Sequence, residues 1–108
     1  MKKVLDLRKV FGVTLSFESE QNPSEPFEME MQLEPNGKSS VHAHPHQQEF
    51  YDVKEGELDI YLDDRWSTVK AEQQVLIPQA TKHAFRNSGT KNVIALNKHV
   101  PGLRTKEY

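Results

Sequence analysis

The chain has 108 residues, 14 of them basic and 16 acidic, and a formal net charge of −2. This length predicts one domain, residues 1–108, large enough to bury a core without covalent cross-links. Cysteine is absent, which excludes disulfides, thiolate ligands and thiol nucleophiles, and the scattered basic residues argue against nucleic-acid binding.

The beginning of the chain gives no sign of export or membrane insertion. Met1 to Arg8 carries charges where a secretion signal needs an apolar run. No stretch approaches the roughly 20 apolar residues of a membrane span. We therefore expect a cytoplasmic protein without a membrane partner.

Alternating apolar and polar residues dominate the chain, a pattern typical of strands with one buried face. The alternation occurs at Val13–Phe17, is strict at Phe27–Leu33, and returns at Leu58–Leu62 and Val93–Val100. Turn-forming residues separate these runs, and nowhere does an apolar pattern at helical spacing persist for ten residues. Many short strands of this kind predict an all-β sandwich or barrel.

Histidine and glutamate gather in two segments far apart in the sequence. His42 and His44 are one residue apart, so an extended backbone would place both on the same face of a strand. Pro45 ends that strand because it cannot donate a ladder hydrogen bond, and Glu49 opens the next one. His83 follows a proline-led turn and begins a later strand. Nitrogen-rich sites with one carboxylate suit divalent transition metals, so the sequence predicts a metal site.

These segments resemble the two motifs of the cupin superfamily. The first motif is a glycine, five residues, His-x-His, three or four residues, glutamate, six residues and glycine. Residues 37–56 match it, except that Gly37 lies one residue too close to the histidine pair. The second motif is a glycine, five residues, Pro-x-Gly, two residues, histidine, three residues and asparagine. Residues 72–87 match it, with Ala80 in place of the inner glycine and Glu72 in place of the leading one.

The resemblance implies a fold, a ligand set and a cofactor. The fold is a jelly-roll barrel, also called a double-stranded β-helix. The cofactor is one divalent transition metal ion, with iron or manganese favoured and nickel, zinc and copper as alternatives. The implied metal ligands are His42, His44, Glu49 and His83.

Residues near these ligands are predicted to contact a small-molecule substrate. Met31, Tyr51 and Phe85 lie on inward-facing alternations and would line a pocket. His46 and Gln48 flank the ligands and are also predicted to contact it. His46 forms a second His-x-His pair with His44, but too few residues separate it from Glu49 to match the motif, so we place it on the rim.

Three further predictions concern the surroundings of the site. Gln47, Gln48 and Asn87 are candidates to hold the outer nitrogen of a ligand histidine. His99, in the last strand, is expected to be structural or exposed. No catalytic residue is assigned from the sequence.

The resemblance also implies a function class. It favours a small metal-dependent enzyme of the dioxygenase or isomerase type that acts on a polar or aromatic molecule. The apolar predicted lining lacks an arginine cluster, which disfavours phosphosugars and slightly favours oxygen chemistry. The alternatives are a non-catalytic module that senses a small molecule or a metal and, more weakly, a storage role.

The edges of an open jelly roll need covering, and short members of the superfamily frequently pair. We therefore expect a homodimer, formed by sheet packing or by exchange of an N-terminal strand from Val4 to Val10. The polar tail, residues 101–108, is expected either to dock on the barrel surface or to be the remnant of a longer helix.

Overall fold

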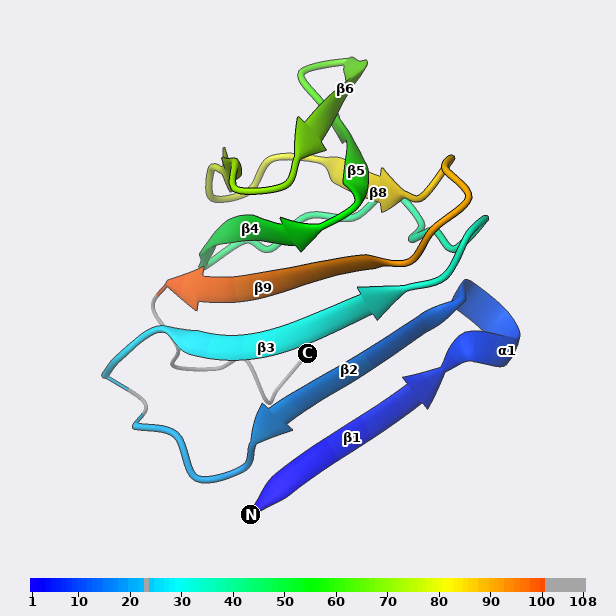
Figure 1. Cartoon of the computed structure of the whole chain (residues 1–108). Helices are drawn as coiled ribbons and strands as arrows, with labels where there is room; N and C mark the ends of the chain where they lie inside the picture. The colour runs from blue at the N-terminus through cyan, green and yellow to red at the C-terminus, as the bar shows by residue number, and fades with distance from the viewer. Residues whose placement is uncertain (23, 101–108) are drawn as a thin grey trace.

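The computed structural model describes residues 1–22 and 24–100, so both expectations for the tail at 101–108 lie outside the described residues. Strands dominate this part of the chain (Figure 1). Among the described residues, no helix has the length and hydropathy that a membrane crossing requires. The elements are β1 (Lys2–Leu7), α1 (Arg8–Phe11), β2 (Val13–Glu18), β3 (Phe27–Leu33), β4 (Gln48–Glu55), β5 (Glu57–Leu62), β6 (Arg65–Lys70), β7 (Gln74–Ile77), β8 (His83–Arg86) and β9 (Val93–Val100).

The strands form two antiparallel sheets. The larger sheet has six strands in the order β1-β2-β3-β9-β4-β7, and the smaller has three in the order β6-β5-β8. In Figure 1 the β6-β5-β8 sheet lies beside the β4 and β7 end of the larger sheet. Strands distant in sequence are neighbours, since β9 inserts between β3 and β4. This arrangement confirms the expected all-β jelly roll.

The core consists of apolar side chains that both sheets contribute to one cluster. Full burial of such a side chain stabilises the fold by about 2 kcal/mol relative to leaving it exposed. The strict alternation at Phe27–Leu33 forms β3, in which Met31 and Leu33 are buried while Glu30 and Gln32 face outward. Core side chains with no exposed surface are Leu33, Val53, Leu58, Ile60, Val93 and Ala95.

The inward faces of β4 and β9 change from apolar to polar along their length. In β4 the inward positions run from Val53 through Tyr51 to Glu49, and all three side chains are buried. In β9 they run, along the chain, from Val93 and Ala95 to Asn97 and His99. The antiparallel register pairs Val53 with Ala95, Tyr51 with Asn97, and Glu49 with His99. Both polar ends therefore lie at the same end of the barrel.

The N-terminal segment differs from the expectation. The strand stops at Leu7, and Arg8–Phe11 forms one helical turn that closes on Gly12 in the left-handed conformation. The prediction of a strand continuing to Val10 is therefore wrong in its second half. Glycine suits this position because it has no Cβ to clash at positive φ.

Candidate metal centre

Four residues from three parts of the chain converge at the polar end of the barrel. One potential ligand atom from each of His42, His44, Glu49 and His83 lies within 4.8 Å of all the others. Glu49 projects inward from β4, and His83 is the first residue of β8. The structure thus brings the four predicted residues together, and their role as metal ligands stays a prediction.

The segment that carries two of the histidines is an extended arm, residues 38–47, and not the strand expected from its sequence. Two isolated bridges, from Lys38 to Arg86 and from His42 to His83, pair it with β8 and its flanks. Single hydrogen bonds from the backbone N–H of Ala80 and from the amide of Gln79 add to them. At the second bridge, His42 and His83 exchange both backbone hydrogen bonds, each with an N···O distance of 2.9 Å. Pro45 in the arm cannot donate to a ladder, and it contributes to this interruption.

Backbone carbonyls set the tautomers of two ligand histidines. Nδ1 of His42 lies 2.8 Å from the carbonyl oxygen of Ser40, and Nδ1 of His83 lies 2.9 Å from that of Thr81. A carbonyl oxygen only accepts, so each Nδ1 must carry the proton. In the neutral form of either ring the unprotonated nitrogen is therefore Nε2, which is the arrangement that a metal-binding imidazole needs.

Two of the ligand atoms face each other without a hydrogen bond. Oε2 of Glu49 and Nε2 of His83 are buried and lie 2.7 Å apart, yet neither makes a hydrogen bond of acceptable geometry. Nε2 of His44 lies 3.4 Å from the same oxygen. Converging lone pairs on buried atoms are unfavourable unless a cation lies between them. The donor set therefore fits a divalent transition metal.

The electrostatics of the site favour the ligand forms of Glu49 and His44, whereas they favour the protonated form of His83. Burial opposes the charge on Glu49, but contacts with His83 and His99 outweigh it and hold the pKa of Glu49 far below its usual range. Burial also lowers the pKa of His44, although Glu49 opposes that effect. For His83, burial is outweighed by Glu49 and the Thr81 carbonyl, so the pKa of His83 is raised. Without a cation, a proton on His83 relieves the facing lone pairs.

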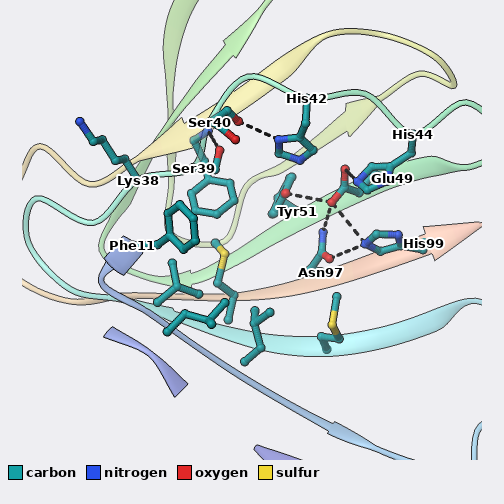
Figure 2. A pocket seen from close by; sticks show the side chains of 16 residues that line it. Phe11, Lys38, Ser39, Ser40, His42, His44, Glu49, Tyr51, Asn97 and His99 are labelled. Carbon is teal, nitrogen blue, oxygen red and sulfur yellow. Dashed lines mark hydrogen bonds and ion pairs between the residues drawn. The ribbon is translucent and has the colours of Figure 1, made fainter. Parts of the chain in front are cut away.

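The second carboxylate oxygen of Glu49 has a different environment, shown in Figure 2. Oε1 accepts hydrogen bonds from the Tyr51 hydroxyl and from Nδ2 of Asn97, each at 2.9 Å. Nε2 of His99 lies 3.3 Å from it. Burial, with the neighbouring carboxylate, raises the pKa of Tyr51 well above its usual value, so its hydroxyl remains a donor.

His99 and Asn97 are the site residues that the sequence reasoning missed. His99 is only 5% exposed and lies beside the ligands, so of the two alternatives, structural or exposed, the exposed one is wrong. A usable signal was present, because the inward alternation of β9 changes from valine and alanine to asparagine and histidine. Polar residues at inward positions of a buried strand are unusual unless they bond to one another or to a site.

The three candidates for orienting the ligands have different environments. The amide of Asn87 donates to the carbonyls of Leu33 and Lys91, so it stabilises a turn. Gln47 is buried and contacts Nδ1 of His99 at 3.2 Å. Gln48 is exposed.

A cavity of about 270 Å³ opens beside the ligands (Figure 2). Its wall includes Met31, Tyr51 and Phe85, as predicted. His46 and Gln48 are exposed and do not line it, so the structure does not support their predicted contact with a substrate there. The remaining lining residues are Leu7, Phe11, Val13, Leu15, Met29, Lys38, Ser39, Ser40, His42, His44, Glu49, Asn97 and His99.

Comparison with known proteins agrees with this architecture. The cupin domain family model matches residues 29–97, more than half of the chain. The chain therefore belongs to the cupin family.

Solved cupins share the fold over most of the chain. An RmlC-like cupin from Shewanella frigidimarina superposes with a TM-score of 0.77 at 17% identity, covering 99% of this chain and 89% of that one. The polyketide cyclase RemF from Streptomyces resistomycificus superposes with a TM-score of 0.72 at 21% identity, covering 82% of this chain and 64% of that one. At these identities the likeness shows the fold alone.

Two curated relatives are similar in sequence over a shorter stretch. Polyketide synthase CurC from Streptomyces cyaneus is 39% identical over 57 residues, which is 53% of this chain and 37% of that protein. Protein SchB from Streptomyces halstedii is 37% identical over 57 residues, which is 53% of this chain and 41% of that protein. The match thus spans less than half the length of either relative.

Proposed function

We propose that this cupin is a metal-dependent enzyme that cyclises a small, enolisable carbonyl compound of the polyketide type. The observation that carries the proposal is the pair of buried, facing atoms Oε2 of Glu49 and Nε2 of His83, which lack hydrogen bonds. Glu49 also lines the apolar cavity. Iron or manganese is our first choice of metal, and nickel, zinc and copper fit the same donors.

Each part of the site has a task in such a reaction. A divalent ion held by the four ligands would supply Lewis-acid polarisation of a substrate oxygen. Met31 and Phe85 in the apolar wall exclude water from the reacting carbons and position the body of the substrate. Lys38 and Ser40 make the approach to His42 polar, which suits a molecule rich in oxygen.

The names of one sequence relative and one structural neighbour support the choice of substrate class. CurC is named a polyketide synthase and RemF a polyketide cyclase. A cyclisation of this class removes a proton from a carbon beside one carbonyl, forms a carbon–carbon bond at a second carbonyl, and releases water. It consumes no oxidant, reductant or second substrate.

The test has two stages, of which the first addresses the metal. Protein purified without an affinity tag is analysed for transition metals, and wild-type protein is compared with His83→Ala and His46→Ala. We expect about one metal ion per chain in wild type and in His46→Ala, and loss of the metal in His83→Ala. Equal metal content in all three proteins would overturn the metal site.

The second stage addresses the reaction. Metal-loaded protein is incubated with a panel of β-diketones and longer polyketones, and products that have lost one water are followed by mass spectrometry. Metal-dependent cyclised products support the proposal. Ligand-induced melting shifts without any turnover would instead favour a sensor or binding module.

Dioxygenase chemistry is the second candidate, because the apolar lining beside the ligands suits oxidation of a poorly soluble phenol or enediol. Oxygen uptake by the iron-loaded protein over the same panel separates the two reactions. Uptake that depends on substrate would select the oxygenase, while cyclisation at constant oxygen would select the cyclase.

A further inference from the structure

We propose that Tyr51 and Asn97 are positioning residues that fix Glu49 so that it offers one oxygen, Oε2, to the metal. This inference rests on the metal centre of the proposed function. It adds how Glu49, the only carboxylate among the four ligands, would bind the metal. Both residues contact Glu49 at Oε1 and not at Oε2.

The two oxygens of Glu49 have opposite environments. Oε1 accepts from the Tyr51 hydroxyl and from Nδ2 of Asn97, each at 2.9 Å. Oε2 makes no hydrogen bond and lies 2.7 Å from Nε2 of His83. A carboxylate held in this way by two donors cannot turn both oxygens toward a cation without breaking those bonds.

The orientation of Asn97 is fixed by its partners. Nδ2 lies near two acceptors, Oε1 of Glu49 and the carbonyl oxygen of Phe50 at 3.3 Å. Oδ1 therefore points the other way, where it lies 2.8 Å from Nε2 of His99. His99 in turn contacts Oε1 of Gln47 at 3.2 Å. The amide is thus held from both sides, and it cannot swap its nitrogen for its oxygen at Glu49 without losing its contacts.

Strand register brings these groups together without any loop. Tyr51 is the direct cross-strand partner of Asn97, and Glu49 is the partner of His99. Tyr51 and Asn97 are 2% and 3% exposed, so water does not compete for their hydrogen bonds with Glu49. Because both strands lie in the interior of the six-stranded sheet, the donors are set before a metal binds.

One-oxygen ligation has a chemical consequence. A carboxylate that used both oxygens would occupy an additional coordination position on the metal. Holding Oε1 away would leave that position to a substrate oxygen. Tyr51 and Asn97 therefore control how open the metal is, although they do not bind it.

Titration with cobalt(II) tests this inference, because the visible spectrum of the bound cobalt ion reports its coordination number as well as its binding. Tyr51→Phe removes only the hydroxyl that holds Oε1, and Asn97→Leu removes the second donor with little change of shape. The matched control is Tyr61→Phe, which removes a hydroxyl that contacts Asp64 at 3.3 Å on an exposed turn.

We expect Tyr51→Phe to bind cobalt about tenfold more weakly than wild type, the scale found for outer partners of metal ligands. Its visible bands should weaken toward those of a higher coordination number, and Asn97→Leu should change in the same direction. Tyr61→Phe should match wild type in both respects. Thermal melting of the metal-free proteins checks that Tyr51→Phe is folded.

Wild-type affinity and spectrum in Tyr51→Phe would overturn the inference and leave the metal centre intact. If wild-type protein bound no cobalt, the metal centre and this inference would fail together. If the variants changed as expected but no carbonyl compound reacted, only the proposed reaction would fail, because the titration does not depend on turnover.

Discussion

The backbone N–H of Ala80 donates to the carbonyl oxygen of His44 across 2.9 Å. The turn before β8 therefore holds a ligand of the arm as well as delivering His83. Ala80 adopts a φ of +60°, and Glu72, which replaces the other glycine of the cupin motif, adopts +70°. The chain thus keeps the left-handed turns while lacking the residue that best tolerates them.

Restoring glycine at these turns should stabilise the protein. We expect Ala80→Gly and Glu72→Gly each to raise the free energy of unfolding by about 1 kcal/mol, because a side chain at positive φ carries strain of this size. Urea denaturation provides the measurement. Ala84→Gly, in the interior of β8, is the control and should lower stability. A loss of stability in Ala80→Gly would contradict the argument.

Replacing the only carboxylate among the ligands should abolish tight metal binding. Glu49→Gln keeps the shape of the side chain but removes its charge, and its amide would direct a donor toward the ligand histidines. We expect affinity for manganese or zinc to fall by roughly a hundredfold or more. Isothermal titration calorimetry measures this, with Glu57→Gln on an exposed position as the control. Unchanged affinity in Glu49→Gln would remove this residue from the ligand set.

Metal affinity should increase with pH because the ion displaces the proton that His83 retains beside Glu49. The pKa of His83 is raised above its usual value near 6.5. Below that raised pKa, affinity should fall by about tenfold for each pH unit, since one proton competes with the metal. Calorimetric titrations from about pH 6 to 8 measure the slope. A flat profile would show that no proton is displaced.

The metal-free protein should show the opposite trend. The pKa of His83 is higher in the folded protein than in the unfolded one. Protonated His83 therefore stabilises the fold fully at a pH below its unfolded-state pKa, and this stabilisation is lost as the pH rises through its folded-state pKa. The free energy of unfolding of chelator-treated protein should therefore fall as pH rises, over the same pH range in which the affinity for the metal increases. Urea titrations with and without chelator compare the two. In His83→Ala we expect the pH dependence of the metal-free protein to flatten.

A homodimer remains a prediction, and β1 is the element that we propose forms its contact. β1 is an edge strand of the larger sheet, and Val4 and Leu5 are 66% and 48% exposed. Exposed apolar residues on an edge strand favour pairing with another chain. Light scattering should give about twice the chain mass of 12.5 kDa, and Val4→Lys should shift it to the single-chain value. Leu76→Lys on β7, the other edge, is the control and should stay dimeric.

The alternation in the sequence predicted the strands that bury one face, and it was less informative for the others. β3 and β9 have the predicted bounds because their apolar positions recur at every second residue. β6 and β7 were not predicted, since their side chains are mostly exposed and carry little apolar pattern. The helical turn α1 was missed because it buries no side chain.

The cluster of four side chains could be predicted because its spacing matches a known motif, whereas the residues that support it could not. Asn97 and His99 reach Glu49 only through the pairing of β4 with β9, and that pairing joins segments more than forty positions apart. Nothing in the local sequence specifies which strands become neighbours. Closeness in sequence is also a poor guide to the site, since His46 lies two residues from His44 and yet its side chain is exposed.

The contrast between the arm and β4 has a consequence for how the ion enters and leaves. Glu49 is anchored by neighbouring strands on both sides, whereas His42 and His44 lie on a segment outside the strands, held by two isolated bridges and single hydrogen bonds. Local opening of that segment costs less free energy than separating central strands. Exchange of the ion is therefore expected to proceed by release of these two histidines first, with amide hydrogens of residues 38–47 exchanging faster than those of β4.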